Sequence, residues 1–299
     1  MPARFSAYPP DAAAIVRVLD DALAYRIGRS PDCELSVDHS SVSRFHAELR
    51  HVRGTWLLQD LGSKNGLRVD GNLVRQAPLE KTTWFAAGDV YCWFEPLAAA
   101  DAAAARAQAE RRRSTSRSLS TQLSSAQNLA TLIPQALDLI LQLSGLERGF
   151  VLYAPQGEPL RVHAWRGLDG TTVSTRGFSG SITAVDRALS EGSSVVCCDV
   201  DQAPWLGARP SVRLGGIRAL VCVPLQVRGD AIGAVYVDSR QPGPAITELD
   251  VELINTVAAQ AAAALSARAL QNDLAELLRD AERAGVAPPL WDDLRLRAG

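Results

Sequence analysis

The chain has 299 residues, of which 47% are hydrophobic, and its 31 basic residues nearly balance its 33 acidic residues. This length exceeds what one ordinary domain needs, so two domains are expected. The charge balance excludes a global positive field for nucleic acid, so a polyanion could bind only at a local patch. The sequence contains no evident signal peptide and no long uncharged apolar stretch, which predicts a cytoplasmic protein with neither a membrane nor a nucleic-acid partner.

Short apolar runs separated by turn residues occupy residues 14–97. In order they are IVRVL, YRIG, ELSV, FHAELRHV, TWLLQDL, LRVDG and VYCWFEPL. None of them continues with the 3.6-residue period of a helix, whereas strands of this length and spacing are typical of sandwiches. The pattern therefore predicts an all-β sandwich for residues 1–97.

Three polar turns of this region carry groups that suit an anion. Arg29 follows Gly28 in a turn between strands, and its planar guanidinium can bind two phosphate oxygens at once. Ser43 and Arg44 supply a hydroxyl donor and a second cation. Asn65 and the glycine after it form a strong hairpin signal, with a positive φ expected at both residues. Turns at one end of a sandwich make a recognition surface.

These motifs resemble those of the forkhead-associated (FHA) domains, β-sandwiches that bind phosphothreonine peptides. The resemblance covers about residues 14–97 and rests on three motifs in the family's order: Gly28-Arg29, Ser43-Arg44-Phe45-His46 and Asn65-Gly66. The chain departs from the family at Leu67, where a hydroxyl residue is common, and at Phe45, where a basic residue is common. The resemblance therefore implies phosphothreonine recognition, and the preference for flanking peptide residues stays open.

The resemblance assigns roles to individual residues. Four of them match positions that contact the ligand: Arg29, Ser43, Arg44 and Asn65. The first two would contact the phosphate, the third would support them, and the asparagine would hold the peptide backbone beyond the phosphothreonine. Three more match positions that shape the loops without touching ligand: Gly28, His46 and Gly66.

An abrupt change of composition marks residues 98–124. An alanine-rich segment there, which favours a helix, leads into the tract RRRSTSRSLSTQ, rich in arginine and hydroxyl residues. Because the tract has no apolar pattern from which to build a core, it is expected to be a solvated and extended linker.

The region from residue 125 to about residue 245 mixes helical and strand patterns, which predicts an α+β domain. It is similar to the GAF family of sensor domains over residues 125–270, most clearly in IRALVCVPLQVRGDAIGAVYVDSR. The resemblance implies a central antiparallel sheet flanked by helices. The residue pattern of cyclic-nucleotide-binding GAF domains is not evident, so a small-molecule ligand in the GAF pocket stays an open possibility and no cofactor is expected.

A long helix is expected at the end of the domain, from Thr247 to Arg283, opening with a Thr-x-x-Asp capping box. At 1.5 Å per residue it would span roughly 55 Å, more than a small domain covers. Its apolar stripe comprises Leu253, Val257, Leu274 and Leu278. The overhanging half is expected to pack against a partner helix in a homodimer, and the alternative is a helix bent back on its own domain. The domain with this helix is assigned to residues 125–285 and a tail to residues 286–299.

No motif of an ATPase, serine hydrolase or zinc protease is present, and the cysteines lack metal-ligand spacing. The sequence thus predicts a non-enzymatic signalling adaptor, with no metal site, that binds a phosphothreonine-containing protein. The partner would be a Ser/Thr kinase or its substrate, and a dimeric GAF domain would sense or relay a second signal. The alternative is a thiol redox sensor or small reductase that uses Cys197, Cys198 and Cys222.

Overall fold

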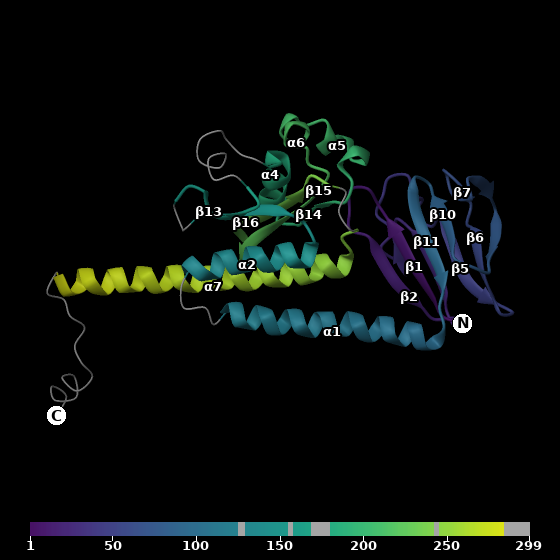
Figure 1. The fold of residues 1–299 in the computed structure, drawn as a ribbon, viewed down its shortest axis with the longest axis horizontal. Helices are drawn as coiled ribbons and strands as arrows, with labels where there is room; N and C mark the ends of the chain where they lie inside the picture. Colours follow the sequence, from purple (N-terminus) through teal and green to yellow (C-terminus); the bar gives the residue numbers. More distant parts are fainter. Residues whose placement is uncertain (125–128, 155–157, 169–179, 242–244, 284–299) are drawn as a thin grey trace, which may run out of the picture.

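The computed structural model describes residues 1–124, 129–154, 158–168, 180–241 and 245–283. The tail assigned to residues 286–299 lies outside these ranges. The chain folds into a β-sandwich, a long connecting helix and an α+β domain that ends in a second long helix (Figure 1). None of the described helices combines the length and the apolar character that crossing a bilayer demands.

The N-terminal sandwich consists of two sheets. The six-stranded sheet has the order β2 (Ile15–Leu19), β1 (Ala3–Tyr8), β11 (Val90–Pro96), β10 (Thr83–Ala87), β7 (Leu67–Val69) and β8 (Asn72–Val74). The five-stranded sheet has the order β4 (Leu35–Ser36), β3 (Ala24–Gly28), β5 (Ala47–Val52), β6 (Thr55–Asp60) and β9 (Gln76–Leu79). All neighbouring strands are antiparallel except β3 and β4. The predicted all-β sandwich is confirmed, and every expected apolar run overlaps a strand.

The sandwich begins earlier than the apolar runs indicated, because β1 precedes residue 14 and pairs with both β2 and β11. Side-chain alternation buries Ala3, Phe5 and Ala7 of this strand in the core between the sheets. Trp56 and Phe94 meet edge to face in the same core, with ring centroids 5.7 Å apart. Two of the three inward residues of β1 are alanines, so its apolar signal is weak and its burial comes from its two neighbouring strands.

The prediction of a hairpin at Asn65-Gly66 is wrong. Strands β6 and β7, which flank this turn, belong to different sheets, so the turn crosses from one sheet to the other. Only the glycine of the pair has a positive φ, 78°. The two-residue hairpin lies just beyond, at Asp70 and Gly71, where φ is 48° and 79° and Val69 pairs with Asn72.

The prediction of an extended linker at RRRSTSRSLSTQ is wrong as well, because this tract is helical. Helix α1 (Ala99–Ser124) runs from the sandwich beneath the second domain and packs against α7 (Glu248–Arg283), as Figure 1 shows. Alanine and arginine are strong helix formers, and the packing against α7 supplies the tertiary support that an isolated helix of this kind lacks.

The C-terminal domain is built on an antiparallel sheet, as expected. Its order is β13 (Arg161–Arg166), β12 (Arg148–Tyr153), β16 (Asp230–Ser239), β15 (Ala219–Val227) and β14 (Val195–Cys197). Helices α2 (Leu129–Ser144) and α7 cover one face, and the other face carries α4 (Ile182–Glu191), the short helices α5 (Pro204–Gly207) and α6 (Pro210–Gly215), and a 3-10 turn η1 (Val200–Gln202) (Figure 1). The predicted α+β architecture is confirmed.

Helix α7 divides into a buried half and an exposed half. Leu253 and Val257 are 3% and 0% exposed in the core, whereas Leu274 and Leu278, on the same stripe, are 58% and 46% exposed. Figure 1 shows the second half continuing past the edge of the domain. The alternative of a helix bent back on its own domain is therefore wrong, because the overhang has no sheet beneath it.

Candidate functional site

The three polar turns singled out in the sequence meet at one end of the sandwich. The backbone N–H of Arg29 donates to the carbonyl of Ser43 at 2.9 Å, and that of Ser30 donates to the carbonyl of Arg44 at 3.1 Å. The hydroxyl of Ser43 accepts the backbone N–H of Lys64 at 2.9 Å. These bonds join the turns after β3, before β5 and before β7, so the structure brings together residues that are separated by up to 35 positions.

Gly28 allows the first two turns to approach. A Cβ atom at this position would lie 2.2 Å from the carbonyl oxygen of Arg44 and 2.8 Å from the sulfur of Cys33. The first contact cannot be relieved without moving backbone, and the second requires the Cys33 side chain to shift, so any larger residue would push the turns apart. The expected loop-shaping role of Gly28 therefore has a direct geometric cause.

His46 ties the second turn to the third. Its side chain is fully buried, its Nδ1 accepts the backbone N–H of Ser43 at 3.1 Å, and its Nε2 lies 3.1 Å from the carbonyl oxygen of Gly66. Because the amide must donate and the carbonyl must accept, the ring is neutral with its proton on Nε2. Burial lowers the pKa of His46 below its ordinary value, which favours this neutral form.

The third turn presents Asn65 at the surface. Its side-chain Nδ2 donates to the carbonyl of Ser41 at 2.7 Å, and within the described residues its amide oxygen has no partner. Gly66 has a φ of 78°, and a Cβ atom there would lie 2.4 Å from the side chain of Leu73. The amide is thus held in one orientation with acceptor capacity left over for a ligand.

Residues that the sequence analysis missed brace this turn. Both carboxylate oxygens of Asp60 accept bonds from Ser63, whose hydroxyl accepts the backbone N–H of Gly66 at 3.1 Å. Asp60 also accepts the N–H of Gly62 at 2.9 Å. The signal was present in the stretch DLGS, because aspartate and serine side chains commonly bond to backbone two or three residues onward.

The hydroxyl of Ser41 adds a further brace that no local pattern indicated. It accepts the backbone N–H of Asp89 at 2.9 Å, from the turn between β10 and β11. Two residues separated by 48 positions are joined in this way. The bond ties the turn that carries Ser43 to the opposite sheet.

The rim of the site is basic. Arg29, Arg44 and Lys64 are exposed, and none of them forms an ion pair within the part of the chain that the structure describes. The hydroxyl of Ser43 already accepts one bond, so its proton is free to be donated outward. Uncompensated cations beside an oriented hydroxyl and an oriented amide form a site that would attract and orient an anionic group.

The cysteines of the second domain form no comparable site. Cys197 and Cys222 lie in the core beneath α4, α5 and α6, whereas Cys198 lies on the opposite face of the sheet. Burial raises the pKa of Cys197 to about 12, and it raises the pKa of the other two as well. A catalytic thiol needs the opposite shift. Among the described residues, no group of three or more His, Cys, Asp or Glu side chains lies close enough together to hold a metal ion.

Comparison with known proteins identifies a family for each of the two domains. Residues 25–90 match the family model of the FHA domain, and residues 128–265 match that of the GAF domain. The chain therefore contains an FHA domain followed by a GAF domain. Among curated proteins, it is 34% identical over 79 residues to the nuclear inhibitor of protein phosphatase 1 of Homo sapiens, and equally to that of Bos taurus. The match covers 23% of this chain and 22% of each relative, so the chain spans about a fifth of their length.

Solved structures resemble each domain separately. The FHA domain of the CT664 protein from Chlamydia trachomatis is 25% identical, with a TM-score of 0.31, over 33% of this chain and 100% of that chain. The first FHA domain of Rv1747 from Mycobacterium tuberculosis is 24% identical, with a TM-score of 0.28, over 32% and 97%. The GAF domain of the Acinetobacter phosphoenolpyruvate-protein phosphotransferase is 15% identical, with a TM-score of 0.42, over 52% and 93%.

Proposed function

We propose that this chain is a non-enzymatic signalling adaptor whose FHA domain binds phosphothreonine in a partner protein, either a Ser/Thr kinase or its substrate. The observation that carries the proposal is the rim of Arg29, Arg44 and Lys64, none of which is neutralised by an ion pair within the described residues. A phosphothreonine brings a charge of about −1.5 to −2 and three acceptor oxygens. Arg29 and the hydroxyl of Ser43 would bind the phosphate, and Arg44 would add a second cation. Asn65 would hold the peptide backbone.

The test is titration calorimetry of the full chain with peptides that carry phosphothreonine, phosphoserine or unmodified threonine in the same sequence. We expect binding of the phosphothreonine form and none of the unmodified form. Capture of proteins from native cytoplasm on the full chain, with and without phosphatase treatment, would then identify the partner. Equal binding of phosphorylated and unmodified peptides would contradict the proposal.

We also propose that the GAF domain acts as a homodimer through the overhanging half of α7. The exposed leucines there are Leu270, Leu274, Leu277 and Leu278, at 62%, 58%, 67% and 46% exposure. Their spacing of four, three and one residues makes a continuous stripe on one side of the helix, the pattern of a coiled-coil seam. A second copy of the same helix offers a matching stripe, which makes a symmetric pair the simplest way to cover it.

Light scattering tests the dimer directly. The full chain should have twice the monomer mass of 32.0 kDa, and removal of residues 266–299 should leave a monomer. Leu274→Lys should weaken the dimer, whereas Asn272→Lys, which adds the same charge on the opposite side of α7, should leave it intact. A monomer mass for the full chain at micromolar concentration would refute the proposal.

The redox alternative is the weaker of the two readings, because the three thiols lie on two faces of the sheet and burial favours their protonated forms. Thiol titration separates the alternatives. The adaptor should show no rapidly reacting thiol in the native state, whereas a redox enzyme requires at least one exposed thiolate of lowered pKa.

A further inference from the structure

The FHA and GAF domains contact each other at the start of α7. The loop of residues 9–14, between β1 and β2, extends from the sandwich to the second domain. The backbone N–H of Ala14 donates to the carbonyl of Ile246 at 2.7 Å, and the N–H of Glu248 donates to the carbonyl of Ala14 at 2.9 Å. Ala14 is fully buried, and Ala13 packs against the GAF core. We call residues 9–14 the docking loop.

The docking loop covers Cys198. The sulfur of Cys198 lies 3.5 Å from the carbonyl oxygen of Ala12 in the loop and 3.8 Å from that of Ile246. The sulfur is therefore enclosed partly by its own domain and partly by a segment of the FHA domain. Cys198 stays partly exposed in this arrangement, and withdrawal of the loop would expose its sulfur further.

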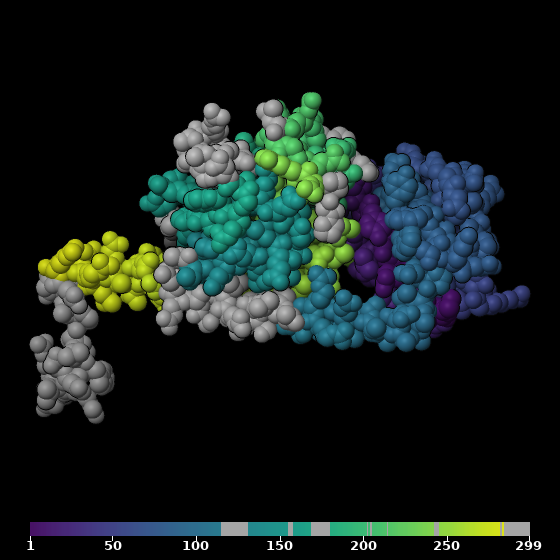
Figure 2. Space-filling view, viewed as in Figure 1, coloured from purple at the N-terminus to yellow at the C-terminus, as the bar shows by residue number. Residues whose placement is uncertain are grey.

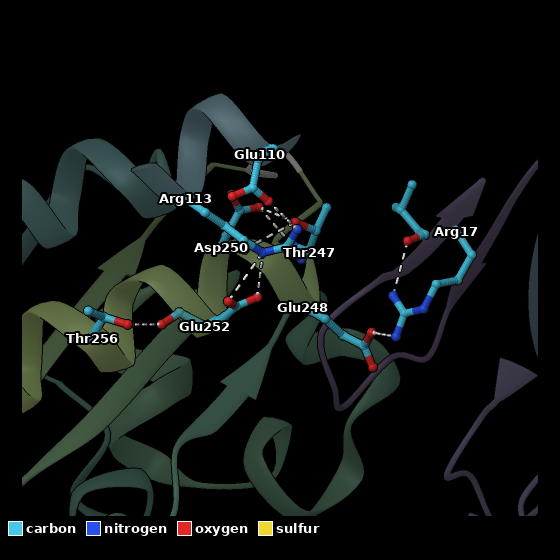
Figure 3. Close-up of polar contacts among 9 residues, drawn as sticks. Arg17, Glu110, Arg113, Thr247, Glu248, Asp250, Glu252 and Thr256 are labelled. Carbon is cyan, nitrogen blue, oxygen red and sulfur yellow. Dashed lines mark hydrogen bonds and ion pairs between the residues drawn. The ribbon is translucent and has the colours of Figure 1, made fainter. Parts of the chain in front are cut away.

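Three carboxylates in the first two turns of α7 hold the rest of the interface (Figure 3). Glu248 pairs with Arg17 of strand β2 at 2.5 Å. Glu252 accepts two bonds from Arg113 of α1, each 3.2 Å long. Asp250 pairs with Arg112 of the same helix. We call these three ion pairs the clasp. They join the sandwich, the connecting helix and α7 at one point.

Asp250 has a second role within α7. Its other carboxylate oxygen accepts the N–H and the hydroxyl of Thr247 at 2.8 and 2.7 Å, and the hydroxyl of Thr247 lies 3.2 Å from the N–H of Asp250. This is the capping box predicted from the sequence. Replacing Asp250 would damage the helix cap as well as the clasp, so the clasp has to be tested from its arginine side.

The contact has the character of a reversible interface. The side chains of the Arg17–Glu248 pair are 48% and 41% exposed, and those of the Arg113–Glu252 pair are 35% and 50% exposed. Beside the clasp lies a cleft of about 960 Å³ between the outer face of β1, β2 and β11 on one side and α1 and α7 on the other. Figure 2 shows this hollow between the purple sheet and the neighbouring helices. Each solvated ion pair beside an open cleft contributes little to the stability of the interface, and salt screens its attraction.

We propose that the clasp and the docking loop form a reversible latch between the domains, and that opening it undocks the FHA domain from α7 and uncovers Cys198. The latch acts on the first turns of the same helix whose far end carries the exposed leucine stripe. One continuous helix, α7, therefore connects the latch to the leucine stripe. The inference does not depend on the phosphothreonine ligand, because it rests on contacts away from that site.

The test is the rate at which N-ethylmaleimide labels each cysteine of the full chain, resolved by mass spectrometry. Replacing both Arg112 and Arg113 by glutamine should raise the rate at Cys198 by about threefold or more, because two clasp pairs are lost. Arg111→Gln is the matched control. It removes one positive charge from the same tract, against two in the double variant, and Arg111 forms no ion pair within the described residues.

A charge swap gives a second, independent arm. Arg17→Glu and Glu248→Arg should each raise labelling of Cys198, and the double variant should return it toward the rate of the unaltered chain. Cys33, Cys92 and Cys222, buried within the separate domain cores, should stay protected throughout. The proposal is overturned if the clasp variants label Cys198 no faster than Arg111→Gln does. It is equally overturned if all the buried thiols become reactive together, because that result means general unfolding.

Discussion

Replacing Arg29 by alanine is the cleanest perturbation of the proposed phosphopeptide site. The side chain is exposed, and within the described residues it has no ion pair, so its removal should change the free energy of unfolding by no more than about 0.5 kcal/mol. A hydrogen bond to a charged group contributes about 1.5–3 kcal/mol. Since about 1.4 kcal/mol corresponds to a tenfold change in affinity, Arg29→Ala should weaken phosphopeptide binding by about 10- to 100-fold. The affinity of Arg29→Lys should lie between that of the unaltered chain and that of Arg29→Ala, because lysine keeps the positive charge and loses the planar guanidinium.

The assay is calorimetry of the full chain with one phosphothreonine peptide at fixed salt, alongside urea denaturation of each variant. The matched control is Arg53→Ala. Arg53 is also exposed and lies in the turn between β5 and β6, at the end of the sandwich away from the site. The reasoning fails if Arg29→Ala binds as tightly as the unaltered chain. It also fails if Arg53→Ala loses as much affinity, because the effect would then be one of overall charge.

Three further predictions concern stability. Gly28→Ala should cost about 1–3 kcal/mol in urea denaturation and also lower phosphopeptide affinity, because the new methyl group would meet the carbonyl of Arg44 at 2.2 Å. Below about pH 6.5 the unfolded state takes up a proton at His46 before the folded state does, so stability should fall with falling pH, and His46→Gln should remove this contribution. Arg148→Met should cost about 3–5 kcal/mol, because it leaves Asp238, 1% exposed at its side chain, without its buried partner; adding Asp238→Leu should restore most of the loss.

The features that could be predicted from the sequence are those encoded within a few neighbouring residues. Short apolar runs separated by turn residues indicated the strands, and Thr247 followed by Asp250 indicated the cap of α7. The hairpin between β15 and β16 closes through Arg228 and Gly229, both with positive φ, in a turn flanked by two apolar runs of the sequence. The three polar turns could be selected from their residue types because guanidinium, hydroxyl and amide groups are suited to phosphate whatever their surroundings.

The tertiary structure decided the features that depend on distant neighbours. Strand β1 is a strand because β2 and β11 flank it, and the Asn65-Gly66 turn crosses between sheets because β6 and β7 pair with different partners. A hairpin signal describes only the turn, so it could not distinguish this crossing from the true hairpin at Asp70 and Gly71. The helical form of the connecting tract likewise depends on α7, which is more than a hundred residues away.

The interdomain latch shows most clearly the difference between features set by local sequence and features set by distant neighbours. Arg17 and Glu248 are separated by 231 positions, and nothing local in either stretch indicates the other. Cys197 and Cys222 lie on one face of the sheet and Cys198 on the other, yet the docking loop contacts both neighbouring cysteines, Cys197 through the carbonyl of Pro10 and Cys198 through that of Ala12. Local patterns determine which elements form, because backbone conformation and side-chain period are short-range properties. The partners of those elements depend on which faces must be buried together, and only the assembled chain settles that.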